Sequence, residues 1–404
     1  MGVVMQNSAR TRKLPNQALY VACALIVLVA LGADFPLWSN ADNAPMEIGG
    51  VPVVTLTRPQ AKHVRKPQFV EATVLPGEGM NLFQVKAAWP GKGVINLIYS
   101  PDLAAAKGQL ESDKNAFGNM SFTFGGAMLL PFANRIRGTV SGDKKTITAN
   151  IGGHDVTLPA NWKGKGADAE VHAIHGFIYS ARFTAEQKNA RDSSSVQGTL
   201  QAGNFNGHWP SQTEVVDNVT LKDRELVISV TAKNVGTESL PMAIGMHPYF
   251  AIPSGDRDQA RLKVPAAERA LANNYDDVFP SGQLQAVKGT PYDFNAAHGV
   301  ALGKLYLDDS FTDLQRNRKG QAVIELIDSA ARYGLRITTA SDRIRAVQVY
   351  APPDHNFVAI EPQFNLADPF DTKIWGKTDT GVDYLAPGES AHWEIRLELF
   401  VPSR

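Results

Sequence analysis

The sequence predicts an all-β protein, a large sandwich of antiparallel sheets. Short runs rich in Val, Ile, Thr and Phe recur along the chain, as is typical of strands. Turn-forming residues separate these runs, and the chain holds 34 glycines and 24 prolines. No long amphipathic helix pattern and no repeat of fixed period is visible. A chain of 404 residues with this layout is long enough to bury a substantial core between sheets.

Residues 1–41 predict an export signal or an N-terminal anchor. Arg10, Arg12 and Lys13 precede an uncharged apolar run over residues 18–33, and small residues suited to cleavage follow. The run is shorter than the roughly 20 residues that a membrane-spanning helix needs, so a cleaved signal is favoured over an uncleaved anchor. The protein is therefore expected to be exported, to a periplasm or to the extracellular space.

Residues 42–67 contain several prolines and basic residues with little periodicity, and they predict a linker. The folded domain is expected over residues 68–404. Its first part predicts a meander of strands with one short helix or loop over residues 103–110. The strands of this meander are expected at residues 70–74, 80–88 and 93–99.

The later part of the domain continues in the same style. A hairpin is predicted over residues 146–159, with Gly152-Gly153 as its turn. The clearest strand is the alternating run over residues 226–232, and Asp217-Asn218 and Lys222-Asp223 predict turns before it. Further strands are expected at residues 321–327, 335–339, 346–350, 357–360 and 393–400.

The composition excludes several classes of function. Lys plus Arg and Asp plus Glu number 40 each, so no net field favours nucleic acid or an anionic membrane surface. The single cysteine, Cys23, lies inside the apolar N-terminal run. The expected domain therefore has no thiol for a disulfide, a thiolate zinc site or a cysteine nucleophile. A small, neutral partner is expected.

Two residues suit acid–base chemistry. His247 follows a strand expected to end near Gly245, which would place it at a rim or on a concave face. Glu361 follows the apolar run 357–360, and burial there would raise the pKa of its carboxyl towards the range of a useful base. A strand-end histidine or glutamate with a purely structural role fits each residue equally well when it is taken alone.

Other polar residues are candidates for a pocket wall. Asn134 and Arg135 follow a buried apolar run and could donate hydrogen bonds to hydroxyls, although an arginine that pairs at the surface fits as well. His172 and His175 have the spacing of a metal pair on a helix, but their neighbours favour a strand. Residues three apart in a strand face opposite ways, so one histidine is expected to be structural and the other to face a ligand.

Several stretches together resemble the aldose 1-epimerase, or galactose mutarotase, family. They occur in the family's order over roughly residues 71–399, and the resemblance implies a galactose mutarotase-like β-sandwich. The motifs are Pro131-Phe132-Ala133-Asn134-Arg135-Ile136, Ile174-His175-Gly176, His247-Pro248-Tyr249-Phe250, Leu307-Asp308-Asp309-Ser310-Phe311 and Ile360-Glu361-Pro362-Gln363, with Leu385-Ala386-Pro387-Gly388-Glu389-Ser390 before the last strand.

The resemblance also implies a reaction, the interconversion of the α and β anomers of a free aldose. Glu361 would take the proton of the C1 hydroxyl, and His247, as an imidazolium, would protonate the ring oxygen. Neither a cofactor nor a metal is implied, and the partner is a small-molecule sugar. Substrate hydroxyls would be bound by Asn134, Arg135, His175 and Asp308, with Asp309 as a close competitor for the last role.

Two other functions remain open. A non-catalytic carbohydrate-binding domain of the same fold would use Glu361 and His247 only as hydrogen-bonding groups. A glycoside-cleaving enzyme is less well supported, because that chemistry uses two carboxylates and the pair here is a histidine and a glutamate.

Overall fold

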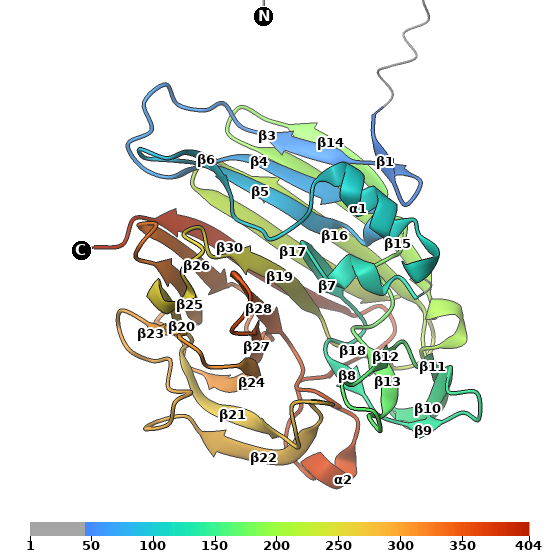
Figure 1. Cartoon of the computed structure of the whole chain (residues 1–404). Coiled ribbons are helices and arrows are strands. Elements are labelled where there is room, and N and C mark those ends of the chain that lie inside the picture. Colours follow the sequence, from blue (N-terminus) through green and yellow to red (C-terminus); the bar gives the residue numbers. More distant parts are fainter. Residues whose placement is uncertain (1–44, 116, 404) are drawn as a thin grey trace, which may run out of the picture. The chain divides into compact units, whose positions relative to one another are not determined.

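The computed structural model describes residues 45–115 and 117–403, which fold mainly into antiparallel strands (Figure 1). The all-β prediction is confirmed. The expected export segment, residues 1–41, lies outside the described residues. Among the helices of the described part, none is long and apolar enough to cross a membrane.

Two large sheets contain most of the strands. In spatial order, the nine-stranded sheet consists of β14 (Thr184–Asn189), β15 (Ser194–Gly203), β16 (Thr213–Leu221), β17 (Glu225–Asn234), β30 (Ser390–Phe400), β26 (Tyr333–Thr339), β25 (Val323–Asp328), β20 (Ala260–Lys263) and β23 (Val300–Ala301). The seven-stranded sheet consists of β22 (Pro280–Ala286), β21 (Ala266–Ala272), β24 (Leu307–Leu314), β27 (Ala346–Ala351), β28 (Phe357–Gln363), β19 (Gly245–Ala251) and β7 (Gly126–Leu129).

Smaller elements surround these sheets. A four-stranded sheet contains β3 (Val54–Thr57), β4 (Gln68–Leu75), β5 (Asn81–Trp89) and β6 (Gly93–Asn96). Shorter sheets pair β1 (Glu47–Ile48) with β2 (Val51–Pro52), β18 (Leu240–Met242) with β29 (Asp383–Leu385), β9 (Thr139–Val140) with β10 (Thr146–Ile151) and β11 (His154–Pro159), and β8 (Arg135–Ile136) with β13 (Val171–Ile174) and β12 (Trp162–Lys163). The helices are α1 (Leu103–Leu110) and α2 (Thr372–Trp375), with 3₁₀ turns η1 (Pro76–Glu78), η2 (Asp113–Asn115), η3 (Asn119–Phe122), η4 (Phe205–Gly207) and η5 (Arg257–Gln259).

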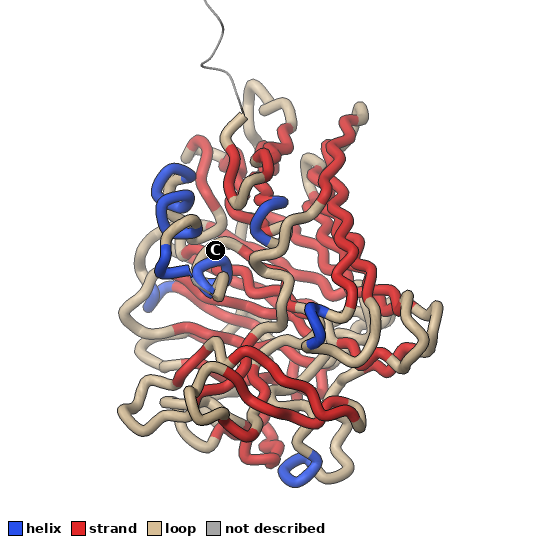
Figure 2. Tube along the Cα trace, turned by 90° about the vertical axis from the view of Figure 1, so that its right-hand side faces the viewer, coloured by secondary structure: helices blue, strands red, loops and turns tan. Residues whose placement is uncertain are grey.

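The strands stack in layers around one main core (Figure 2). Strand β28 shows how the sequence builds this arrangement. Val358 and Ile360 lie in the core, and the Trp393 indole of β30 donates a hydrogen bond to the Pro362 carbonyl at 3.1 Å. Because side chains alternate along a strand, Ala359 and Glu361 face the other side of the sheet. That side is buried too, which explains why the strand reads as one continuous apolar run.

The predicted linker needs correction in its described part. Strands β1, β2 and β3 lie within it, and β3 pairs with β4 from Val54↔Val74 to Thr57↔Glu71. The side chains of Ile48 and Leu56 are fully buried. Prolines and basic residues made this stretch look like a linker, but its few apolar side chains add to the core and to a sheet edge.

Local patterns predicted other elements well. The hairpin over residues 146–159 is β10 and β11, and α1 spans residues 103–110 with Asp102 as its N-cap, accepting from the Ala105 N–H at 2.8 Å. The turn expected at Asp217-Asn218 is wrong, because both residues lie inside β16. Asp217 is buried there, and burial raises the pKa of its carboxyl well above its usual range, which disfavours its charged form.

Candidate active site

Cross-strand register brings four polar side chains into one row on the seven-stranded sheet. The row lies on the face that points away from the main core. Ser310 of β24 pairs with Gln348 of β27, and Gln348 pairs with Glu361 of β28. Strands β19 and β28 pair at Gly245↔Gln363 and at Tyr249↔Ala359, so His247 lies opposite Glu361 between these two pairs. Side chains directly opposite each other on neighbouring strands share a face. The row therefore sets the histidine beside the glutamate, although the two are far apart in the sequence.

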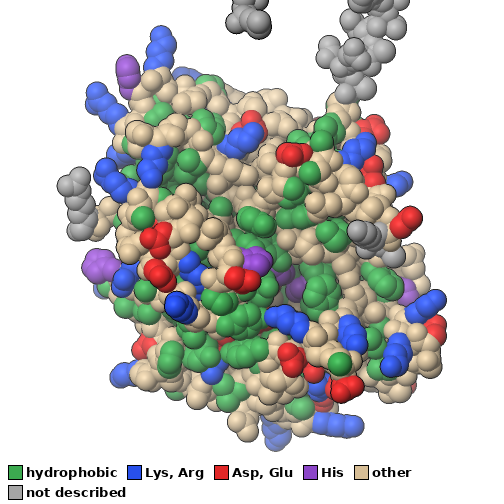
Figure 3. Space-filling view, in the orientation of Figure 1, with side chains coloured by type: hydrophobic (Ala, Val, Ile, Leu, Met, Phe, Trp, Pro, Cys, Tyr) green, Lys and Arg blue, Asp and Glu red, His purple; other side chains and the backbone are tan. Residues whose placement is uncertain are grey.

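The next row along the same face forms the floor of a pocket. Asp308 pairs with Tyr350, Tyr350 with Ala359, and Ala359 with Tyr249. Ala359 is fully buried and packs in one cluster with Tyr249, Phe357 and Tyr350. Asp308, Tyr249 and Tyr350 line a pocket of about 380 Å³, within the range that small-molecule sites occupy. Figure 3 shows this face of the molecule, with hydrophobic side chains around the pocket.

Segments that precede the nine-stranded sheet in the sequence also line the pocket. They contribute Phe122, Trp162 and His175, while the seven-stranded sheet contributes the floor. Phe122 contacts the rings of His175 and His247, with centroids 4.8 and 6.4 Å away. Tyr249, but not Phe250, belongs to the wall, since Phe250 is buried in the main core.

His247 and Glu361 form a close, buried pair. His247 Nε2 lies 3.3 Å from Glu361 Oε1, and the two side chains are 8% and 2% exposed. Burial, together with the charge of Arg135, lowers the pKa of His247 to about 3. Burial, with a contribution from Asp308, raises the pKa of Glu361 well above its usual range. Burial therefore disfavours the charged form of both groups, including the imidazolium that the sequence led us to expect.

One polar atom of each member of this pair is buried without a hydrogen-bond partner in the described part of the chain. Among the described residues, neither Glu361 Oε2 nor His247 Nδ1 is hydrogen-bonded. Unsatisfied buried polar atoms cost free energy unless a ligand or water meets them. Both of these atoms are themselves buried in the described structure.

His247 lies in the middle of β19, so its expected position at the end of a strand is wrong. The strand continues through Pro248, Tyr249 and Phe250 to Ala251, between β28 and β7. The concave setting that was expected for His247 is nevertheless what the pocket provides.

Asn134 and Arg135 are held at the pocket by a side chain from another part of the chain. Asn134 has a φ of 63°, which is uncommon for a residue with a side chain. Asn365 fixes the preceding residue, since its Oδ1 accepts from the Ala133 N–H at 3.1 Å and its Nδ2 donates to the Ala133 carbonyl at 2.8 Å. Arg135 Nη1 donates to Asn134 Oδ1 at 2.9 Å, which orients both side chains.

Gln348 connects the groups that line this side of the pocket. Its Nε2 donates to Asp308 Oδ1 at 2.7 Å, and its Oε1 accepts from Asn134 Nδ2 at 3.2 Å and from Ser310 Oγ at 2.5 Å. Arg135 Nη2 lies 3.7 Å from Asp308 Oδ2. The sequence reasoning missed Gln348. Its one signal was a polar residue in the centre of the apolar strand 346–350.

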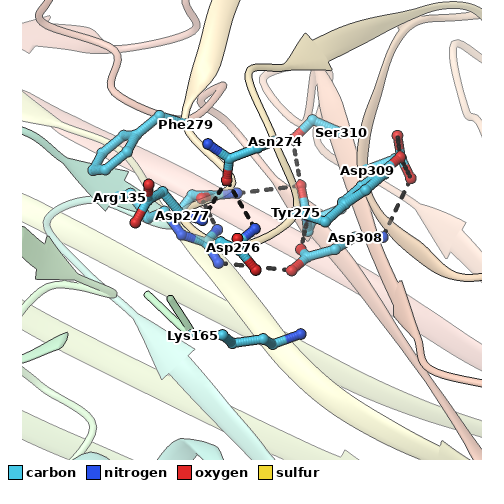
Figure 4. A network of polar contacts seen from close by, with 12 residues as sticks. Arg135, Lys165, Asn274, Tyr275, Asp276, Asp277, Phe279, Asp308, Asp309 and Ser310 are labelled. Carbon is cyan, nitrogen blue, oxygen red and sulfur yellow. Dashed lines mark hydrogen bonds and ion pairs between the residues drawn. The ribbon is translucent and has the colours of Figure 1, made fainter. Parts of the chain in front are cut away.

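The structure decides between the two neighbouring aspartates. Asp308 lines the pocket, whereas Asp309 is buried on the other side of β24 against Arg269 and accepts a hydrogen bond from the Tyr275 hydroxyl at 3.1 Å. Figure 4 shows the two carboxylates pointing away from each other. Burial raises the pKa of Asp308, and Arg135 and Gln348 oppose that shift.

His172, within β13, and His175, just after it, have different surroundings. His175 lies beyond the strand with a φ of 64°, and its Nδ1 accepts the Asn134 N–H at 3.2 Å. The neutral ring must then carry its proton on Nε2, so it can donate to a ligand. His172 is fully buried against Phe279, outside the pocket, and burial lowers its pKa to about 3. His172 is therefore buried away from the pocket and His175 lines it, although the turn beyond β13, rather than the alternation of a strand, separates the two.

All six residues singled out from the sequence line this one pocket: Asn134, Arg135, His175, His247, Asp308 and Glu361. The pocket also extends outwards to Tyr99, Lys165, Asp276, Tyr350, His355 and Phe357. Within residues 45–115 and 117–403, no group of three or more His, Cys, Asp or Glu side chains is placed to hold a metal ion.

The chain resembles solved structures over most of its length. A galactose mutarotase-like protein from Clostridium acetobutylicum is 20% identical, with a TM-score of 0.66, over 83% of this chain and 95% of that one. A GalM/aldose epimerase homologue from C. elegans is 19% identical, with a TM-score of 0.62, over 82% and 96% of the two chains. Galactose 1-epimerase from Lactobacillus acidophilus is 17% identical, with a TM-score of 0.58, over 86% and 98%.

At these identities the likeness is one of fold, and it confirms the predicted galactose mutarotase-like β-sandwich. No match was found among curated proteins. The model of one sequence family, aldose 1-epimerase, matches residues 107–398. This range includes the six pocket residues that the sequence singled out. The chain therefore belongs to the aldose 1-epimerase family.

Proposed function

We propose that this protein is an aldose 1-epimerase that interconverts the α and β anomers of a free aldose. The observation that carries the proposal is the buried pair of His247 and Glu361, 3.3 Å apart on the floor of a pocket, each with one polar atom that no described residue hydrogen-bonds. Anomer interconversion needs one acid and one base on the same hemiacetal, and this pair supplies both.

The reaction can be written with these two groups alone. Glu361 takes the proton of the C1 hydroxyl while the bond between C1 and the ring oxygen breaks, and His247 gives a proton to the ring oxygen. The product is an open-chain aldehyde. Rotation about the C1–C2 bond presents the other face of the carbonyl. The two residues then exchange roles, and the ring closes as the opposite anomer.

The resting state of the pair is compatible with this sequence of steps. A protonated Glu361 beside a neutral His247 holds one proton, and so does the carboxylate beside an imidazolium. One proton transfer between Oε1 and Nε2 connects the two forms. Sugar hydroxyls that replace missing hydrogen bonds around the pair would stabilise the charged form, because desolvation is what disfavours it.

The other pocket residues fit the binding of a neutral, hydroxyl-rich ring. Arg135, Asn134 and His175 offer donors, and Asp308 offers an acceptor, as the family resemblance implies. The Asp308 oxygens already contact Gln348 and Arg135. This suits Asp308 to hold hydroxyls, and it leaves Glu361 without the second free carboxylate that a glycoside-cleaving enzyme uses.

The test is polarimetry of freshly dissolved α-glucose, α-galactose and other aldoses. Wild-type protein is expected to accelerate the approach to anomeric equilibrium, and Glu361→Gln and His247→Asn are expected to lower kcat by about 100- to 10,000-fold. Calorimetric titration of both variants with the same sugar checks that the pocket still binds. If the wild type accelerates none of the sugars, the protein is a carbohydrate-binding domain instead. If both variants keep full activity, the acid–base assignment is wrong.

A further inference from the structure

A second cavity lies behind the segment that carries His175. Its volume is about 390 Å³, close to that of the pocket that holds His247 and Glu361, and the two share no lining residue. Its walls come from the end of β13 and the segment after it, and from β15, which Figure 1 shows on the same side of the fold. We call this cavity the back pocket and the one with His247 the active pocket.

A single layer of chain separates the two pockets. Ala173 lines the back pocket and Ile174 lines the active pocket, as expected where side chains alternate along a strand. At the turn that follows, His175 lines the active pocket and Gly176 lines the back pocket. A molecule in the back pocket would therefore lie against the backbone that positions His175.

Asn161 connects the back pocket to this partition through hydrogen bonds. Its Oδ1 accepts from the Ile174 N–H at 2.9 Å, and its Nδ2 donates to the Ile174 carbonyl at 3.2 Å and to the Tyr179 hydroxyl at 2.7 Å. Asn161 and Tyr179 both line the back pocket. A ligand that hydrogen-bonds either group competes with the contacts that fix Ile174, the residue directly before His175.

The back pocket is suited to a neutral ligand. Among the described residues that line it, none is Lys, Arg, Asp or Glu, whereas Arg135 and Asp308 line the active pocket. A charged ligand would lose water there without gaining an opposite charge. The polar groups include the amides of Asn161, Gln201 and Asn206. Side-chain amides both donate and accept hydrogen bonds, as hydroxyl groups do.

Aromatic side chains form another part of its lining. The Phe177 ring centroid lies 5.5 Å from that of Phe205 and 5.7 Å from that of His208, and all three residues line the back pocket. The C–H face of a ring-shaped polyol is a suitable partner for such rings. His208 Nδ1 contacts the Thr157 carbonyl, which can only accept, so a neutral His208 ring keeps Nε2 as an acceptor for a hydroxyl.

We propose that the back pocket is a regulatory site that binds a neutral, ring-shaped polyol, such as a second sugar molecule. Its occupation weakens the hold of Asn161 and Tyr179 on the partition and so displaces His175 from its place in the active pocket. The regulatory effect rests on the proposed anomer interconversion, whereas the binding site itself does not.

The test uses myo-inositol, a neutral cyclic polyol without a hemiacetal for His247 and Glu361 to open. Calorimetry is expected to show that it binds the wild type about tenfold more tightly than Phe117→Ala/Gln201→Ala, which removes two exposed side chains of the back pocket. Gln197→Ala is the matched control and should bind as the wild type does. Gln197 and Gln201 are both exposed on β15 and bond across to β16, to Asn218 at 2.9 Å and to Glu214 at 2.5 Å, but only Gln201 lines the pocket.

Polarimetry of α-galactose then measures the coupling between the pockets. Inositol is expected to raise KM by about fivefold or more and to reach a plateau, because an effector changes affinity by a limited factor. Competition in the active pocket would raise KM without limit. The plateau effect should be lost in Phe117→Ala/Gln201→Ala and kept in Gln197→Ala.

The outcomes separate this proposal from the proposed function. If galactose is converted but inositol does not bind, binds the double variant equally well, or only competes, the back pocket is no regulatory site and the enzyme stands. If no sugar is converted, the enzyme proposal fails. The binding site then stands if inositol binding is lost in the double variant and kept in Asp308→Asn, which changes the active pocket alone. Loss in Asp308→Asn instead would place inositol in the active pocket and overturn the proposal.

Discussion

Two aspartates that follow each other in β24 have opposite surroundings. Asp308 faces the pocket, where it contacts Gln348 and Arg135, and Asp309 faces Arg269 on the other side of the sheet. Their side chains are 10% and 0% exposed. The same substitution at the two positions should therefore change different properties of the protein.

We expect Asp308→Asn to raise KM for the aldose by about 10- to 100-fold, because a charged acceptor for hydroxyls is lost. Its cost in stability should be smaller than that of Asp309→Asn, because Arg135 lies 3.7 Å from Asp308 and keeps its hydrogen bond to Asn134. Asp309→Asn should lower the free energy of unfolding by about 3–5 kcal/mol, because it leaves the Arg269 guanidinium without its buried partner. Polarimetry and urea unfolding of both variants measure the two effects. Equal changes in KM and stability for both variants would contradict this division of roles.

The buried pair also predicts how activity depends on pH. Burial lowers the pKa of His247 to about 3, so the free imidazole gains no proton near pH 6.5, and burial raises the pKa of Glu361 well above its usual range. We expect kcat/KM to show no transition near pH 6.5, the ordinary pKa of histidine. Polarimetric rates between pH 4 and 9, corrected for spontaneous mutarotation, check this. A transition near pH 6.5 that disappears in His247→Asn would show that the pair is more solvated than it is here.

At the scale of elements, short irregular segments position the pocket residues. The segment that ends β13 turns sharply at His175 and Gly176, with φ values of 64° and 72°. The Gly176 α-carbon lies against the continuation of β7, and a Cβ there would meet the Leu130 carbonyl oxygen at 2.2 Å. Only glycine allows this approach, which sets the His175 ring over the pocket.

Gly176→Ala should therefore destabilise the protein by more than the roughly 1–2 kcal/mol of left-handed strain alone, and it should raise KM by displacing His175. Gly153→Ala is the matched control. Gly153 also has a positive φ, 95°, but no atom of the described chain lies within 4 Å of the place that an alanine methyl group would occupy there. Urea unfolding of both variants gives the comparison. If the two cost the same, the Leu130 contact does not position this segment.

Most strands could be predicted from local alternation, whereas the environments of several polar side chains could not. Strand β17 follows the alternating run over residues 226–232, and β10 and β11 flank the glycine turn that predicted them. Asp217 in β16 looked like a turn residue because aspartate rarely lies in a core. Gln348 gave no sign of its partners, because those partners come from β24 and from the segment before β8.

At the scale of the whole molecule, the sandwich begins earlier in the chain than its composition suggests. Ile48 and Leu56 are fully buried, and β3 adds a strand beside β4. These contacts join the N-terminal part of the described chain to the same domain that carries the pocket. Residues 45–57 therefore belong to the folded domain.

We expect a chain that starts at Pro45 to be more stable than one that starts at Gln68. Two fully buried side chains at about 1.5–3 kcal/mol each give a difference of roughly 3–6 kcal/mol in the free energy of unfolding. The loss of β3 would also expose an edge of β4. Urea denaturation of both chains measures the difference. Equal midpoints and slopes would mean that residues 45–67 behave as the linker that the composition predicted.

The sequence by itself determined the fold class, most strands, the family motifs and the six residues that meet in the pocket, because these depend on local alternation and on short stretches of chain. Only the tertiary structure decided three matters. Strand register set His247 opposite Glu361, the packed face of β24 turned Asp308 rather than Asp309 into the pocket, and burial disfavoured the charged forms of the pair. Strand register, the direction of a side chain and its burial all arise from contacts between distant segments. No local stretch of sequence contains these contacts.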